Sequence, residues 1–230
     1  MQPAGQHLLA WEQAWCDQSL TDVFGLHALP LGLPQLEALR TNRMPHRWLA
    51  DTGCVLTSAE RVALQAHSMA LPFSEASLDL LVLPHTLDTS PDPHASLREV
   101  ERVLVPEGRV VIFGFNPTGL WGLGHLLGRR LPEVDDLIGH WRLRDWLRLL
   151  GFEVVSLELG CYRPDLRALR WFERWAWLER AGPRWWPILG SVYCVQAVKR
   201  VHGMRLLSPA WKDARARRAR AVTTASREME

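Results

Sequence analysis

Two nearly continuous apolar stretches in the middle of the chain enclose a segment with helical periodicity. Residues 77–83 (SLDLLVL) and 108–115 (GRVVIFGF) have the pattern of strands that are covered on both faces of a sheet. Between them, residues 92–104 (DPHASLREVERVL) set leucines and valines on one helical face and arginines and glutamates on the other. An amphipathic helix that joins two such strands indicates a crossover in a parallel sheet.

Similar patterns extend the predicted sheet in both directions. Short apolar runs predict three earlier strands, at residues 28–31, 46–51 and 61–67. A tight turn at Gly32 follows the first of them, and then a helix with Pro34 near its first position, where proline is tolerated. Residues 142–159 predict a helix and a strand, and residues 191–200 a last strand. Residues 8–24 have the spacing of an amphipathic helix, which we expect to pack across the edge of the domain. The sequence therefore predicts a doubly wound α/β domain with a mostly parallel sheet.

Five of the twelve tryptophans lie between Tyr162 and Leu189, just before the last predicted strand. They are Trp171, Trp175, Trp177, Trp185 and Trp186. The segment predicts a helix and a proline-bounded turn, inserted into the α/β repeat. The indoles could pack as a satellite core or a dimer surface, or they could form an aromatic floor for a planar or lipophilic substrate.

Composition describes an ordinary globular chain with a basic end. With 47% hydrophobic and 23% charged residues, the 230-residue chain is neither disordered, collagen-like nor a disulfide scaffold. Its net charge of +2 is unevenly distributed along the chain. Residues 212–230 contain six basic and three acidic residues, whereas residues 1–211 contain 21 basic and 22 acidic residues. We expect a domain at residues 1–211 followed by a basic, disordered tail, since the end segment has almost no large apolar residues. A solvated tail is the simpler interpretation, and contact with nucleic-acid phosphates is the alternative.

The cysteines and the N-terminus bear on the cellular compartment. The four cysteines are too far apart for a CxxC or zinc motif and imply no disulfide framework, so we expect reduced thiols and no metal site. The N-terminus, MQPAGQHLLAWEQAW, has no basic region followed by an apolar one, and no run of about 18 apolar residues occurs. We therefore expect a cytoplasmic protein without a membrane span.

Four short motifs follow one another within residues 60–116. They are LPF at 71–73, SLDLL at 77–81, L-x-E-x-x-R-V-L at 97–104 and PEG at 106–108. In this order and spacing the segment resembles the class I S-adenosylmethionine-dependent methyltransferases, specifically the type 11 group. The resemblance implies a Rossmann-like class I methyltransferase fold, S-adenosyl-L-methionine as cofactor and an unidentified methyl acceptor.

The resemblance assigns two residues to the methionine and ribose parts of the cofactor. In the family, the first strand ends in a glycine-rich turn that lets the backbone approach the cofactor. Only Gly32 matches here, Pro34 occupies a usual glycine position, and a plain turn glycine is the alternative. After the second strand, Asp51 matches the acidic residue that accepts both ribose hydroxyls, although it could instead cap the turn that follows it.

The adenine part is expected beside the loop after the third strand. His67 replaces the usual aspartate there, and its neutral imidazole can accept one hydrogen bond, unless it is only a surface histidine at a strand end. Ser68 and Met69 would line the adenine pocket, and Met69 fits equally well as core filler.

The loop after the fourth strand, LPHTLD, faces the transferred methyl group in the family. His85 is the group in this loop with a useful pKa near neutrality, which makes it the candidate catalytic base. The alternative is a histidine that hydrogen-bonds the backbone and moves no proton. Asp88 and Asp92 are expected to cap the next helix.

These assignments predict a methyltransferase that uses S-adenosyl-L-methionine. Two usual binding features, the second glycine and the adenine-binding aspartate, are missing. A second hypothesis is therefore a catalytically inactive scaffold or binding protein that keeps the fold and uses its Trp-rich face as a contact surface.

Overall fold

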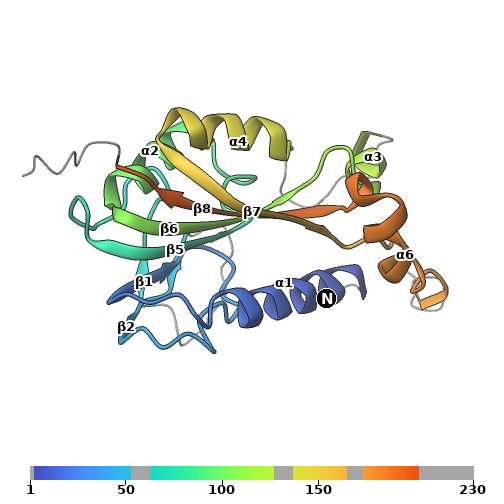
Figure 1. Ribbon diagram of the computed structural model, residues 1–230, viewed down its shortest axis with the longest axis horizontal. Helices are drawn as coiled ribbons and strands as arrows, with labels where there is room; N and C mark the ends of the chain where they lie inside the picture. Colours follow the sequence, from blue (N-terminus) through green and yellow to red (C-terminus); the bar gives the residue numbers. More distant parts are fainter. Residues whose placement is uncertain (1–2, 53–62, 127–136, 165–172, 202–230) are drawn as a thin grey trace, which may run out of the picture. The chain divides into compact units, whose positions relative to one another are not determined.

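The computed structural model describes residues 3–52, 63–126, 137–164 and 173–201. Its centre is a six-stranded sheet in the order β2-β1-β5-β6-β8-β7 (Figure 1). These strands are β1 (His27–Pro30), β2 (His46–Arg47), β5 (Leu78–Pro84), β6 (Leu104–Phe115), β7 (Phe152–Gly160) and β8 (Val192–Lys199). Neighbours among β2, β1, β5 and β6 are parallel, and β8 is antiparallel to both β6 and β7. The predicted α/β fold with a mostly parallel sheet is confirmed.

The second predicted strand is divided in two. Its first half is β2, and its second half, β3 (Ala50–Asp51), pairs in parallel with β4 (Leu64–Gln65) in a small separate sheet. A parallel bridge between Leu31 and Ala50 joins the end of β1 to β3. The chain directions of β1, β3 and β4 therefore agree, and the residues that follow each of them face the same edge.

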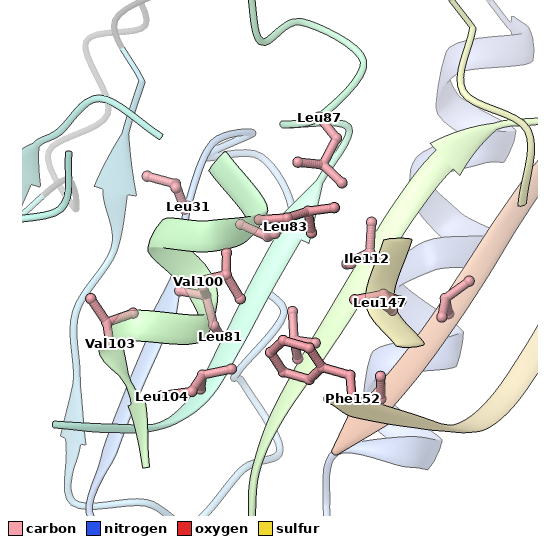
Figure 2. Packing of buried hydrophobic residues seen from close by; sticks show 14 of the residues in the cluster. Leu31, Leu81, Leu83, Leu87, Val100, Val103, Leu104, Ile112, Leu147 and Phe152 are labelled. Carbon is pink, nitrogen blue, oxygen red and sulfur yellow. The ribbon is translucent and has the colours of Figure 1, made fainter. Parts of the chain in front are cut away.

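Helices α2 (Pro93–Val103) and α4 (His140–Leu149) cover one face of the sheet (Figure 1). Asp92 caps α2 as predicted, because its carboxylate accepts from the Ala95 N–H at 3.0 Å. The main buried cluster lies on this face, and Figure 2 shows strand, α2 and α4 residues meeting there. Its labelled members are Leu31, Leu81, Leu83, Leu87, Val100, Val103, Leu104, Ile112, Leu147 and Phe152.

Helix α1 (Pro3–Ser19) covers the opposite face (Figure 1). Trp15 and Cys16 pack against Leu80, Val82 and Phe113 of the two central strands. The Trp15 indole meets the Phe113 ring edge-on, with ring centroids 5.5 Å apart. The expectation that this helix packs across the edge of the domain was wrong, because the alternation of β5 and β6 leaves an apolar face, and in the described part of the chain α1 and the loop after β1 cover it.

The helix expected after Gly32 is replaced by turns. Three backbone bonds, Leu36 N–H to Leu33, Arg40 N–H to Glu37 and Asn42 N–H to Leu39, all span three residues. Leu33 lies at φ +26°, which a helix does not allow. The segment still buries Leu36 and Leu39 beside α1, so its apolar residues serve packing without helical periodicity.

The remaining elements are α3 (Leu120–Leu126), α6 (Leu178–Trp185) and the short 3-10 helix η1 (Pro187–Leu189). They are in the chain segments that connect β6 to β7 and β7 to β8, and α3 and α6 lie at one end of the sheet (Figure 1). Thus a helix and a turn do precede β8 in the Trp-rich segment, while Trp171, Cys54 and the predicted tail at 212–230 lie outside the described residues. In the described ranges, no helix is both long and apolar enough to cross a bilayer.

Candidate active site

The turns after β1 and β5 touch at the carboxyl edge of the sheet. The Thr86 hydroxyl, in the loop after β5, donates to the Leu31 carbonyl at 2.5 Å. Gly32 lies at φ +95°, and a Cβ added to it would be 3.0 Å from the Thr86 oxygen. Glycine is therefore required by backbone conformation and by close approach. The packing favours the turn-glycine interpretation, because Thr86 occupies the space beside Gly32; a cofactor role stays a prediction.

Asp51 ends β3 on the same edge. Gly32 N–H donates to the Ala50 carbonyl at 2.8 Å, which ties the first turn directly to the residue before Asp51. The Asp51 carbonyl accepts from Ala66 N–H at 2.9 Å, and the residue is only 9% exposed. A carboxylate at a strand end with little exposure needs hydrogen-bond donors, which is the property expected of a ribose ligand.

The turn after β4 contains the three residues predicted for adenine. His67 is exposed and Met69 is half-buried, whereas Ser68 is buried. The Ser68 hydroxyl lies 2.9 Å from that of Ser96 and 3.4 Å from that of Ser90. Ser90 and Ser96 are themselves 2.8 Å apart, so the three hydroxyls join this turn to the β5 loop and to α2. The hydroxyl of Ser68 therefore has a structural role, and the place of Ser68 in an adenine pocket stays a prediction.

His85 is the centre of a buried ionisable cluster that also contains Glu12 and Asp88. Its Nε2 lies 2.6 Å from Glu12 Oε1 on α1, and its Nδ1 lies 3.1 Å from Asp88 Oδ2. The ring stacks on Phe115 with centroids 4.2 Å apart. The backbone of His85 is left-handed, at φ +55°, a conformation that few residues other than glycine adopt. Such strain is typical of positions whose side chain is held for a purpose.

The two carboxylates determine the protonation state of His85. Burial by itself lowers the pKa of an imidazole, but Glu12 and Asp88 together raise the pKa of His85 to about 10. Burial raises the pKa of Asp88, against the opposing effects of His85 and of the Phe115 N–H that Asp88 accepts at 3.1 Å. At neutral pH the imidazole therefore carries a proton on both nitrogens and has no lone pair with which to act as a base.

Glu12 was missed from the sequence, and Asp88 was misassigned. Glu12 is completely buried, one helical turn from Leu8 and from Trp15, so the spacing of the apolar face could have revealed it. Asp88 does not cap α2, because its carboxylate is bound to His85 and to the backbone of Phe115. One oxygen of each carboxylate, Glu12 Oε2 and Asp88 Oδ1, has no hydrogen-bond partner among the described residues.

A cavity of about 370 Å³ lies beside the end of β1, and none of the predicted site residues lines it. Its walls include Pro30, Leu36, Arg47 and Trp48, on the side where turns replace the expected helix. In the described ranges, no group of three histidine, cysteine or acidic residues has an arrangement that could hold a metal ion.

Comparison with known proteins agrees with this architecture. Residues 46–112 match a family described as "Methyltransferase domain". A segment of 97 residues is 43% identical to the uncharacterized protein YafS of Escherichia coli K12, over 41% of this chain and 40% of that protein. The match thus spans about two fifths of the length of this curated relative.

Two solved structures have the same fold. One chain of the complex between the Haloferax volcanii Trm112 methyltransferase activator and a methyltransferase superposes with a TM-score of 0.62, at 19% identity, over 86% of this chain and 93% of that chain. A SAM-dependent methyltransferase from Archaeoglobus fulgidus superposes with a TM-score of 0.59, at 16% identity, over 83% and 94%.

The sheet order, the antiparallel β8 and the loops at the carboxyl edge define a class I methyltransferase fold. The match to the methyltransferase domain family at residues 46–112 then agrees with the resemblance to the class I methyltransferases of the type 11 group that the sequence motifs predicted.

Proposed function

We propose that this protein is an S-adenosyl-L-methionine-dependent methyltransferase whose cofactor binds at the carboxyl edge of the sheet. The proposal rests on one observation: the segments that match the methyltransferase domain family meet at one edge of the sheet. The residues that match the methyltransferase domain family, 46–112, include Asp51, the turn at 67–69 and the β5 loop. The parallel strands β1, β3, β4 and β5 all end at this edge, so these segments face a common space. Ligands of open α/β sheets bind in that position.

The residues at this edge fit the cofactor unequally. Asp51 fits best, because a barely exposed carboxylate matches the two hydroxyl donors of a ribose. Gly32 and Ser68 would contribute through their backbones, since Thr86 fills the space beside Gly32 and the Ser68 hydroxyl is bonded to Ser96. When bound, the cofactor's sulfonium supplies an electrophilic methyl group to a nucleophile in line with it. The residues of this chain would bind and orient the two partners and exclude water.

We assign His85 as a positioning residue of this site. To act as a base it would first have to lose a proton that two carboxylates stabilise. As an imidazolium it links α1, through Glu12, to the β5 loop and the end of β6, through Asp88. It would thereby fix the loop that faces the transferred methyl group.

The direct test is a titration with S-adenosylhomocysteine. We expect the melting temperature to rise with ligand concentration, because the ligand binds the native state only. Asp51→Ala should weaken binding at least about tenfold, since a charged group would lose its hydrogen bonds to the ligand. Isothermal calorimetry on both forms would give the dissociation constants.

The matched control is Asp145→Ala, which removes an exposed carboxylate on α4, away from the proposed site. It should bind like the wild type. An absence of any shift at millimolar ligand would refute the proposal and favour the inactive scaffold. Unchanged affinity in a folded Asp51→Ala protein would remove Asp51 from the site.

A further inference from the structure

The segment before β8 carries a cluster of exposed aromatic side chains. Four tryptophans and one isoleucine form it, and we call them the Trp face: Trp175, Trp177, Trp185, Trp186 and Ile188. Their exposed fractions run from 39% for Trp175 to 70% for Trp185. Trp175 and Trp177 stack on each other with ring centroids 6.3 Å apart. Four exposed indoles within one short segment are unusual on a soluble surface and mark an interaction site.

A close packing contact and two hydrogen bonds to backbone carbonyls attach the segment that carries the Trp face to the rest of the domain. A Cβ on Gly182 would lie 2.3 Å from the Tyr162 ring, so α6 is in direct contact with the residues after β7. The Tyr162 hydroxyl donates to the Pro187 carbonyl at 3.1 Å, and the Asn116 amide donates to the Ile188 carbonyl at 2.9 Å. None of the five residues belongs to a buried cluster. The segment therefore presents its aromatic side chains outward.

The charges around the Trp face are mainly positive. Among the described residues 173–189, Arg174, Arg180 and Arg184 are exposed, against one exposed acidic residue, Glu173. The other carboxylate, Glu179, is bound inward: its Oε1 lies 2.8 Å from His7 Nε2 on α1 and 3.9 Å from Arg163 Nε. The outward surface thus combines indoles with guanidinium groups.

We propose that the Trp face docks on the surface of an anionic lipid bilayer. Indoles have an apolar body and a polar N–H, and they bind preferentially at the level of the lipid headgroups. Exposed arginines beside them would contact anionic headgroups, so charge and shape both suit this surface. Docking of this kind goes beyond the proposed methyl transfer and does not depend on it.

Vesicle sedimentation with the full chain tests the proposal. The protein should sediment with vesicles of phosphatidylcholine and phosphatidylglycerol, and more weakly with phosphatidylcholine alone. Trp185→Ala/Trp186→Ala should reduce the partition coefficient at least about tenfold, because two interfacial anchors are lost. Trp141→Ala is the matched control: Trp141 is 56% exposed on α4, outside the Trp face, and its variant should sediment like the wild type. Thermal melting should show that both variants are as stable as the parent, since all three indoles are exposed.

The basic segment 212–230 could also attract anionic vesicles, and salt separates the two causes. Purely electrostatic attraction disappears at high salt, whereas part of the binding by inserted indoles persists. Binding that is lost entirely at high salt and is equal in the double variant and the wild type would overturn the proposal. So would a change of oligomeric state in the double variant with unchanged vesicle binding, because the face would then join copies of the chain. Vesicle binding in a protein that fails to bind S-adenosylhomocysteine would leave this inference intact and remove only the proposed function.

Discussion

At position 32, both the backbone conformation and the packing require glycine. The residue is left-handed at φ +95°, and Thr86 approaches from the β5 loop to a distance that a Cβ could barely tolerate. The sequence alone identified a turn glycine here. The contact with a loop more than fifty residues away became visible only in the folded chain.

Gly32→Ala should lower the free energy of unfolding by about 1–3 kcal/mol, because alanine is strained at positive φ and its Cβ meets Thr86. Urea denaturation would measure the loss. Gly5→Ala is the control: a Cβ on Gly5 meets nothing within 4 Å in α1, so no loss of stability is expected there. Equal stability of Gly32→Ala and the wild type would mean that the turn relaxes at no cost.

The raised pKa of His85 predicts a stability that falls as the pH rises. In the unfolded chain a histidine releases its proton near pH 6.5, whereas folded His85 keeps it up to about pH 10. The stabilisation is complete below pH 6.5 and is lost progressively up to pH 10. Between about pH 7 and pH 8, the unfolding free energy should fall with a slope that approaches 1.4 kcal/mol per pH unit.

Denaturant titrations at several pH values in that window would measure the slope. His85→Gln should remove it, because glutamine binds no proton, and Glu12→Gln should make it shallower, because one of the two stabilising carboxylates is lost. Parallel slopes in the wild type and His85→Gln would show that His85 is neutral in the native state. A neutral His85 could then act as the catalytic base.

At the scale of elements, helix α1 makes two kinds of contact. Its apolar side covers the second face of the sheet, and Glu12, on the same side, reaches the β5 loop. The periodicity of residues 8–24 was enough to predict a helix. It could not indicate which surface the helix covers, because periodicity defines an apolar side but not its partner.

Trp15→Ala should lower the free energy of unfolding by about 3 kcal/mol, because a large cavity opens against Phe113. The value belongs at the low end for a buried tryptophan, since within the described ranges its indole N–H has no hydrogen-bond partner to lose. Trp141→Ala, at an exposed position on α4, should change stability by less than about 1 kcal/mol. Chemical denaturation of both variants gives the comparison. A small effect of Trp15→Ala would indicate that α1 is dispensable for the sheet.

At the scale of the whole molecule, three thiols report on global unfolding. Cys16, Cys161 and Cys194 are free and completely buried, and burial raises the pKa of each. Thiol reagents need an accessible thiolate, so these cysteines should react only when the domain opens.

A Cys54→Ser protein isolates these three groups. Its reaction with a thiol reagent should be at least about a hundredfold slower in buffer than in denaturant. Absorbance of the released chromophore would follow both reactions. Rapid modification of one thiol in buffer would reveal local opening around it: of α1 for Cys16, or of the end of β7 for Cys161.

Local patterns in the sequence determined the central strands, helix α2 with its Asp92 cap, the mostly parallel sheet and the methyltransferase resemblance. Each of these depends on residues close together in the chain, where strand and helix periodicities and motif spacings can be read directly. The tertiary structure alone decided that α1 covers a face, that turns follow Gly32, and that Ser68 bonds to Ser90 and Ser96. It also decided that His85 meets Glu12, 73 positions away, and so carries a proton instead of accepting one. The pKa of a buried group depends on which charges folding brings beside it, and no local pattern specifies them.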